Sequence, residues 1–203
     1  DEDETELILR TLQERGARRI ALVTGCDHNS WNLDSASAYR TWAERHGMPA
    51  RVVARPEADG TGGGRDAVAE LLKDGDLPDA IYCLTGRHAR GILDELTARG
   101  IAVPEQVQLV AGADSEQSRS ASPAITAIDL DPELIAAQAV EQLTSRVMAG
   151  LPAEPPRTLP RLLPRGAGLP RRRPLPLQQL REGRHQVGLA PRGAGMLLQG
   201  RGA

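Results

Sequence analysis

The sequence predicts an α/β fold in which a parallel sheet carries helices on both faces. Two observations lead to this prediction: short apolar runs alternate with segments of helical spacing between residues 3 and 149, and the links between them are short. This alternation is typical of parallel strands joined by right-handed crossovers. Because the chain has no Phe, two Trp and two Tyr, the core is expected to consist of Leu, Val, Ile and Ala.

The first part of the chain supplies three predicted helices and two predicted strands. Residues 3–15 are expected to form a helix that a glycine stops, and the apolar run 19–25 predicts a buried strand. A second helix over 34–47 also ends at a glycine, and the run 50–55 predicts the next strand. Residues 63–75 have one apolar face and predict the third helix.

The second part continues the same alternation. The run 79–84 predicts a strand, and residues 86–100 predict a helix whose apolar residues recur at helical spacing, namely Ala89, Ile92, Leu93 and Leu96. The runs 107–112 and 124–128 predict two further strands. A last helix is expected over 131–149, because an Asp and a Pro open it as N-cap and first helical residue.

The charges divide the chain into two regions of different composition. Residues 1–154 contain 15 Lys or Arg against 26 Asp or Glu, whereas residues 155–203 contain ten Arg against one Glu. The stretch 164–203 is rich in Arg, Pro and Gly and shows no strand or helix period. We therefore expect it to be a disordered tail, since such a segment cannot bury enough apolar surface to fold. A nucleic-acid-binding basic patch at "GLPRRRP" is the alternative.

Several kinds of site are excluded by motif. The glycine run "GTGGG" at 60–64 lacks the Lys-Ser/Thr ending of a phosphate-binding loop and does not match a dinucleotide fingerprint, so we expect a flexible lead-in to the following helix. The four His show no metal-binding spacing, and no nucleophile elbow is present. The sequence therefore predicts no enzyme, no cofactor and no metal site. The two Cys, the lack of a signal peptide and the lack of a long apolar segment predict a cytoplasmic protein with free thiols.

Polar residues follow three of the predicted strands. The segments 26–31, 85–88 and 113–116 each begin where a strand ends. In parallel α/β sheets ligands bind beyond the carboxyl ends of the strands. We therefore expect these three loops to converge on one rim, although ordinary surface loops would fit the topology equally well.

Four segments resemble the lactose repressor (LacI/GalR) family of bacterial transcription regulators. They are "GARRIALVTG", "AYRTWAERHG", "PDAIYCLTGRHARGILDELTARGIAVPEQVQLVAGADS" and "SPAITAIDLDPELIAAQAVEQLTSRVMAG". The third is the most specific, with a helix end, a Val-Pro-Glu turn, a strand and an acidic loop. The resemblance covers roughly residues 5–163 and implies the effector-binding core, which has a periplasmic-binding-protein-like fold of two subdomains around a cleft.

The resemblance also implies a division of the chain. Residues 1–128 would form the second subdomain, residues 129–163 would be a helix and strand that return to the first subdomain, and residues 164–203 would be the tail. It implies a small effector, often a sugar or a nucleobase, a homodimer, and operator DNA bound by a helix-turn-helix domain that is absent from this chain.

The family's functional positions carry over unevenly. Asp114 stands where members place an acidic cleft residue, Thr85 where many have Asn, and Ser35 where many have an Arg that binds the effector. Arg87 could supply a substitute charge or be solvated, and Trp31 could stack on a ring or belong to the core. The effector-binding candidates are thus Asp114, Thr85, Arg87, Ser35 and Trp31. For the dimer interface the helix at 86–99 supplies Arg90, Leu93 and Asp94.

Two alternatives to a ligand-sensing regulator stay open. A solute-binding protein of a transport system would have the same fold. A Rossmann-like, nucleotide-dependent enzyme is the other alternative, which the missing glycine fingerprint disfavours.

Overall fold

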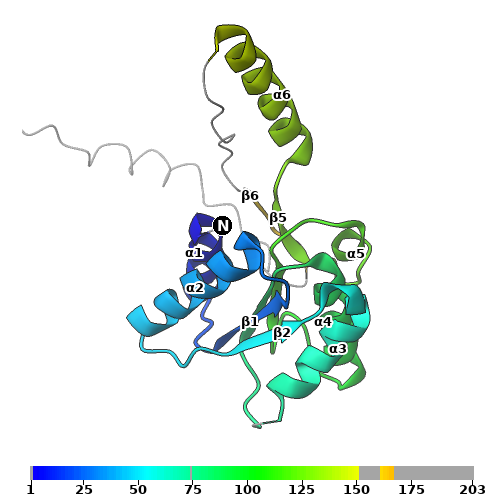
Figure 1. Ribbon diagram of the computed structural model, residues 1–203. Helices are drawn as coiled ribbons and strands as arrows, with labels where there is room; N and C mark the ends of the chain where they lie inside the picture. The colour runs from blue at the N-terminus through cyan, green and yellow to red at the C-terminus, as the bar shows by residue number, and fades with distance from the viewer. Residues whose placement is uncertain (1, 74, 151–160, 167–203) are drawn as a thin grey trace, which may run out of the picture. The chain divides into compact units, whose positions relative to one another are not determined.

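The computed structural model of this protein describes residues 2–73, 75–150 and 161–166 (Figure 1). The helices are α1 (Glu2–Glu14), α2 (Ser30–Arg45), η1 (Glu57–Asp59), α3 (Gly60–Leu71), α4 (Gly86–Ala98), α5 (Glu116–Arg119) and α6 (Pro132–Ala149). The strands are β1 (Ile20–Gly25), β2 (Val52–Arg55), β3 (Ala80–Cys83), β4 (Gln108–Ala111), β5 (Thr126–Asp129) and β6 (Arg161–Leu163).

The strands form one six-stranded sheet in the order β2-β1-β3-β4-β5-β6. The first five are parallel, and β6 pairs with β5 in the antiparallel direction, with Ile128 opposite Leu162. The predicted mostly parallel sheet is therefore confirmed. The antiparallel edge strand was not foreseen, because the sequence pattern of a strand does not give its direction.

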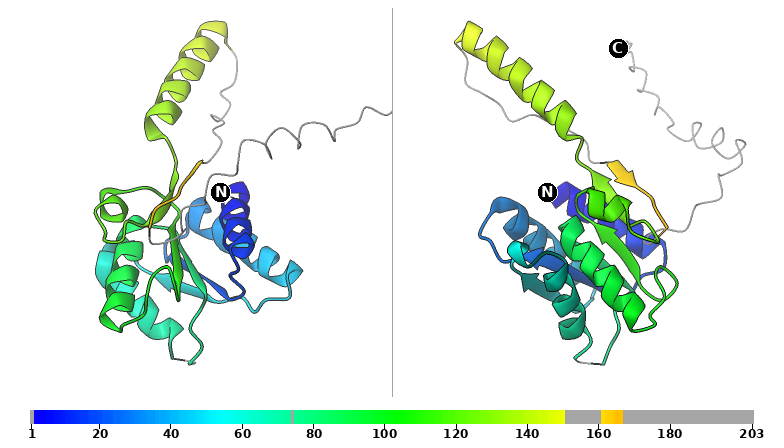
Figure 2. Two further views of the ribbon diagram at one scale, coloured as in Figure 1. Left: turned by 180° about the vertical axis from the view of Figure 1, so that it is seen from behind. Right: turned by 90° about the vertical axis from the view of Figure 1, so that its right-hand side faces the viewer.

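Helices cover both faces of the sheet, as predicted, and each face has its own core (Figures 1 and 2). On one face α1 and α2 pack on the strands through side chains that include Leu9, Tyr39 and Trp42. On the other face α3 and α4 contribute Val68, Ile92 and neighbouring aliphatic residues. The strands between the two layers are buried on both sides, which explains why they appear in the sequence as continuous apolar runs.

The glycine run at 60–64 lies inside α3, so the expectation of a flexible lead-in is wrong. The glycines allow α3 and α4 to approach each other closely. A Cβ atom on Gly64 would overlap the carbonyl oxygen of His88, and one on Gly91 would overlap that of Thr61. The sequence pattern shows the cost of glycine in a helix but not this tertiary reason for it.

One helix start and one short helix also differ from the predictions. Helix α2 begins at Ser30 instead of residue 34, because the Asn29 side chain caps it and accepts a hydrogen bond of 2.8 Å from the backbone N–H of Asn32. The short helix α5 was not predicted. It begins at a capping box in which Ser115 and Ser118 each accept from the other's backbone N–H.

Helix α6 has the predicted bounds almost to the residue, and none of its residues is buried. Its apolar stripe is exposed at Val140, Leu143 and Val147. The division of the chain at residues 128 and 163 stays a prediction, and the tail expected at 164–203 lies outside the described residues except for 164–166. No helix among the described residues is both long enough and apolar enough to cross a membrane.

Candidate functional site

Three loops at the carboxyl ends of the strands lie on neighbouring strands of the sheet. The loops follow β1, β3 and β4, which are consecutive in the strand order. Two of them touch, because a Cβ atom on Gly86 would overlap the hydroxyl of Ser115. The predicted convergence of the loops on one rim is therefore present in the fold.

The residues after β3 serve the start of α4. Thr85 is the N-cap, and its hydroxyl oxygen accepts a hydrogen bond of 3.3 Å from the backbone N–H of His88. His88 is buried, and its Nε2 lies 3.1 Å from the carbonyl oxygen of Pro56 at the end of β2. Arg87 is exposed. Of these residues, Thr85 and Arg87 lie on the rim as predicted, while His88 belongs to the packing between helices α3 and α4.

The two candidates on α2 occupy different environments. Trp31 is half-buried and packs against the core beneath α1 and α2. Ser35 is fully buried, and so is Thr5 on α1. Both lie near the phenol of Tyr82, whose pKa is raised by burial, an effect that these two hydroxyls oppose. Ser35 therefore belongs to a polar spot inside the core below the rim.

The loop after β1 is held by Asn32, a residue that the sequence analysis did not single out. Its buried side-chain oxygen accepts hydrogen bonds from the Thr24 hydroxyl at 3.2 Å and from the Gly25 backbone N–H at 3.3 Å. Its amide nitrogen donates to the carbonyl oxygen of Asp27 at 3.0 Å. The loop is thus fixed from within, while Asp27 and His28 remain exposed.

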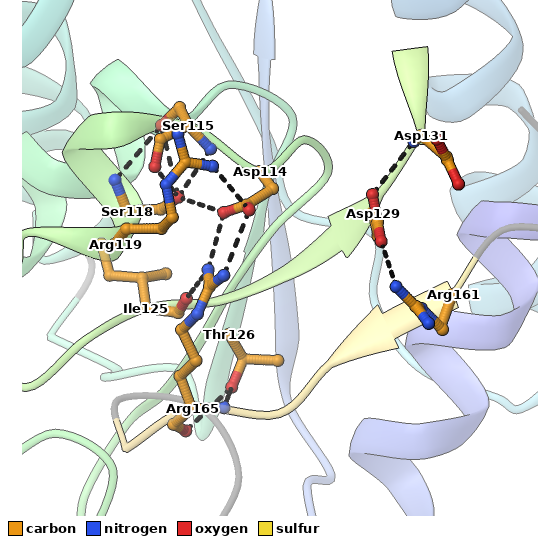
Figure 3. Close-up of polar contacts among 10 residues, drawn as sticks. All are labelled: Asp114, Ser115, Ser118, Arg119, Ile125, Thr126, Asp129, Asp131, Arg161 and Arg165. Carbon is orange, nitrogen blue, oxygen red and sulfur yellow. Dashed lines mark hydrogen bonds and ion pairs between the residues drawn. The ribbon is translucent and has the colours of Figure 1, made fainter. Parts of the chain in front are cut away.

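Asp114 is the centre of the polar network at the rim (Figure 3). Its Oδ1 accepts hydrogen bonds from Arg165 Nη1 at 2.7 Å and from the Ser118 hydroxyl at 3.1 Å. Its Oδ2 accepts from Arg119 Nη1 at 2.8 Å and from Arg165 Nη2 at 3.1 Å. The Arg165 guanidinium therefore binds both carboxylate oxygens, which is the strongest geometry for such a pair.

This network keeps the carboxylate ionised. Partial burial raises the pKa of Asp114, but the hydrogen bonds from Arg165, Arg119 and Ser118 outweigh it and hold the pKa well below its usual range. Asp114 is therefore a fixed negative charge at the rim across the physiological pH range.

Strand β6 brings a second arginine to the same region. Arg161 contacts Asp129, at the end of β5, at 2.6 Å (Figure 3). At the other end of the strand the backbone N–H of Arg165 donates to the Thr126 hydroxyl at 2.8 Å, and that hydroxyl donates to the Arg165 carbonyl at 2.9 Å. Neither Arg119 nor Arg165 was singled out from the sequence. Arg119 is only five residues from Asp114, on the short helix α5 that was not predicted, whereas nothing local marks Arg165, which lies 51 residues away.

The candidates for the dimer interface do not all lie on the surface. Arg90 donates to Asp94 at 2.9 Å, one helical turn along α4, as the spacing suggests. Arg65 on α3 lies 3.8 Å from the same carboxylate. Leu93 is buried in the core, so it cannot contact a second chain unless the domain rearranges.

The two cysteines are free, as predicted. Cys26 is exposed in the loop after β1, whereas Cys83 is buried at the end of β3, where burial raises the pKa of its thiol to about 12. A buried thiol of this kind is unreactive at neutral pH.

A surface hollow of about 240 Å³ lies at the opposite end of the sheet. The hollow is lined by Arg19, Ile20, Pro49, Arg51 and Asp76. Arg19 donates to Asp79, and Arg51 donates to the backbone carbonyls of Asp76 and Leu71. Both cations are thus engaged in holding loops together, and the rim at the carboxyl ends is the better candidate for a ligand.

Known transcriptional repressors are similar in sequence to parts of this chain. The HTH-type transcriptional repressor PurR of Haemophilus influenzae (strain PittEE) is 31% identical over 84 residues, which are 41% of this chain and 25% of the relative. The lactose operon repressor of Escherichia coli (strain K12) is 28% identical over 147 residues, which are 70% of this chain and 39% of the relative. The chain thus spans less than half the length of either relative. Both are transcriptional repressors and not enzymes.

Solved structures resemble the chain over most of its length. A LacI transcriptional regulator from a Rhodococcus species superimposes with a TM-score of 0.74 at 27% identity, over 82% of this chain and 62% of that one. The transcriptional regulator CelR in complex with cellobiose gives a TM-score of 0.70 at 25% identity, over 81% of this chain and 51% of that one. Residues 9–167 match the periplasmic binding protein-like domain. The chain therefore belongs to the periplasmic binding protein-like domain family, in the form found in lactose-repressor-type transcriptional regulators.

Proposed function

We propose that this chain senses a small molecule at the rim formed by the loops after β1, β3 and β4, and that it does so as part of a DNA-binding transcription regulator. The observation that carries the proposal is the contact between the loop at Gly86 and the loop at Ser115, which brings Thr85 and Asp114 to the same edge of the sheet. Ligands of α/β sheets bind at this edge.

The ligand that fits best is a sugar or another small polar metabolite. A fixed carboxylate, here Asp114, suits a ligand that carries hydroxyl groups, because its oxygens accept hydrogen bonds. The CelR relative was solved with cellobiose, a sugar. Ser35 offers no cationic group, and Arg87 and Trp31 would supply charge and a stacking surface at the edge of the site.

Further proposals follow from the relatives. We expect operator DNA to be bound by a domain outside these 203 residues, and the regulator to act in the cytoplasm as a homodimer. Helix α4 would lie at the dimer interface through Arg90 and Asp94. If so, an Arg90→Leu variant should change the dimer dissociation constant in sedimentation equilibrium, whereas an Arg40→Leu variant on α2 should not.

The test of the sensing function is a binding screen followed by mapping. We expect a mono- or disaccharide, or a nucleobase, to raise the melting temperature of the chain in a panel of such compounds. The backbone amide NMR signals of residues 85–86 and 113–115 should then shift in proportion to occupancy. A ligand that shifts only the signals around Arg19 and Arg51, at the other end of the sheet, would overturn the proposal.

A further inference from the structure

Both oxygens of the Asp114 carboxylate accept hydrogen bonds from neighbouring side chains. A carboxylate offers about four lone-pair positions, two on each oxygen. Oδ1 accepts from Arg165 and Ser118, and Oδ2 accepts from Arg119 and Arg165. The Ser118 hydroxyl has a single proton, which it shares between Asp114 at 3.1 Å and the Ser115 carbonyl oxygen at 2.8 Å, so the two arginines are the firm partners of the carboxylate, and a ligand hydroxyl at Asp114 competes with them.

The two arginines are held to very different degrees. The side chain of Arg165 is 19% exposed, binds both oxygens of Asp114, and donates as well to the carbonyl oxygen of Ile125 at 3.2 Å. The side chain of Arg119 is 56% exposed and makes one hydrogen bond to Asp114. An exposed single contact of a long side chain is worth little, so Arg119 is the partner that a ligand can replace.

Arg165 also connects Asp114 to the edge of the sheet. Its backbone exchanges two hydrogen bonds with the Thr126 hydroxyl on β5, and it lies two residues past the end of β6, the strand that pairs with β5. The loop after β4 and the strand β6, which are far apart in sequence, thus meet in one side chain (Figure 3). The other ion pair of β6, between Arg161 and Asp129, lies at the opposite end of the strand and does not touch Asp114.

We propose that Arg165 is a positioning residue that links the carboxylate of Asp114 to the docking of β6, and that Arg119 occupies the place on Asp114 that a ligand hydroxyl takes. The part that concerns the ligand hydroxyl at Arg119 rests on the proposed function, whereas the link between Arg165 and β6 does not. The link couples the docking of β6 to the position of the Asp114 carboxylate. A change that draws the carboxylate away from Arg165 loosens β6, and undocking of β6 releases the carboxylate from Arg165. Because the position taken by Arg119 accepts a hydrogen bond, the ligand group that replaces it must be a donor, such as the hydroxyl of a neutral polyol.

The link can be tested on this chain without any ligand. The carboxyl ¹³C signal of Asp114 is followed by NMR as the pH is lowered, and amide hydrogen exchange is measured at Leu162 and Leu163. In an Arg165→Gln variant we expect Asp114 to titrate closer to the ordinary value for Asp and the β6 amides to exchange at least tenfold faster. An Arg119→Gln variant should move the titration less and leave the β6 amides unchanged.

The matched control is Arg161→Gln, which removes the other ion pair of the same strand. As long as the β6 amides of this variant exchange as slowly as those of the wild type, the titration of Asp114 should be unchanged, because Arg161 does not touch that carboxylate. If Arg165→Gln does not fold, Arg165→Lys keeps the charge but loses the two-pronged contact and should show the same changes in weaker form. The link would be overturned if Asp114 titrated as in the wild type in the Arg165→Gln or the Arg165→Lys variant. It would also be overturned if the β6 amides exchanged as fast in Arg119→Gln as in Arg165→Gln. A chain that shows the link but binds no polyol would overturn the proposed ligand class alone.

Discussion

Asp114 is held by two arginines, so its loss should be felt in the stability of the domain. An Asp114→Asn substitution removes the charge-assisted bonds from Arg119 and Arg165 and leaves Arg165, a largely buried cation, without its counter-ion. Hydrogen bonds to charged groups contribute about 1.5–3 kcal/mol. We expect a decrease of about that size in the free energy of unfolding by urea. Asp129→Asn, whose partner Arg161 is exposed, should cost clearly less; equal losses would contradict the assignment of a special role to Asp114.

The same carboxylate should make stability depend on pH. Its hydrogen bonds to Arg165, Arg119 and Ser118 lower the folded-state pKa of Asp114 against the opposing effect of burial, while the unfolded chain has the ordinary value of about 3.9. The stabilisation is therefore complete above that value and is lost as the pH falls through the lower folded-state pKa. Urea unfolding at pH 7, 4 and 3 should show the difference between wild type and Asp114→Asn shrinking toward low pH. A constant difference would show that folding does not lower the pKa of Asp114.

At this scale the sequence led to only part of the site. Thr85 and Asp114 could be placed on one rim, because both follow strands of a parallel sheet. Arg165 could not be found in this way, since an ion pair across 51 residues depends on where β6 docks, and Arg119 was missed together with the short helix α5 that carries it. Ser35 shows the converse: the family resemblance suggested a ligand contact, but its side chain is buried in the core beside Tyr82.

The element that tests the packing argument best is α3. Glycine usually weakens a helix by about 0.5–1 kcal/mol relative to alanine. Gly62→Ala, where the new methyl group meets no atom within 4 Å, should therefore raise the free energy of unfolding by about that amount. Gly64→Ala places the methyl group on the His88 carbonyl of α4 and should instead lower it, by about 1–3 kcal/mol for overpacking.

Urea unfolding of the two variants side by side measures the difference. Because both changes make the same substitution in the same helix, their propensity effects cancel. If Gly64→Ala is as stable as Gly62→Ala, helices α3 and α4 do not approach as closely as their glycines indicate.

At the level of elements, the spacing of apolar residues predicts helices that have one apolar face and strands that are buried on both sides. It placed every strand from β1 to β5 and all of the longer helices. It failed at α5, whose four residues are too short to show a period, and at the start of α3, where a glycine run looked like a break. At α5 the deciding interaction is the local capping box that joins Ser115 to Ser118, whereas at α3 it comes from elsewhere in the fold, from the surface of α4.

For the whole molecule the distribution of charge decides how it meets DNA. The first 154 residues are strongly acidic and would be repelled by phosphates, while the last 49 carry ten Arg. Specific recognition needs an element that enters a groove and contacts base edges, whereas attraction between arginines and phosphates carries no sequence information. These opposite charges lead to a definite expectation for the chain on its own.

We expect these 203 residues to bind DNA weakly, without sequence preference, and only at low salt. Each phosphate that an arginine neutralises releases counter-ions, so the affinity should fall steeply, by a factor of about 10³ or more for some six contacts, between 50 and 200 mM salt. Fluorescence anisotropy with an operator-like and a scrambled duplex measures this, and a chain ending at residue 166 is the control that should lose most of the binding. Binding that survives 200 mM salt and prefers one duplex would mean that the acidic part of the chain contacts base edges, and the regulator would not need a separate domain to find its operator.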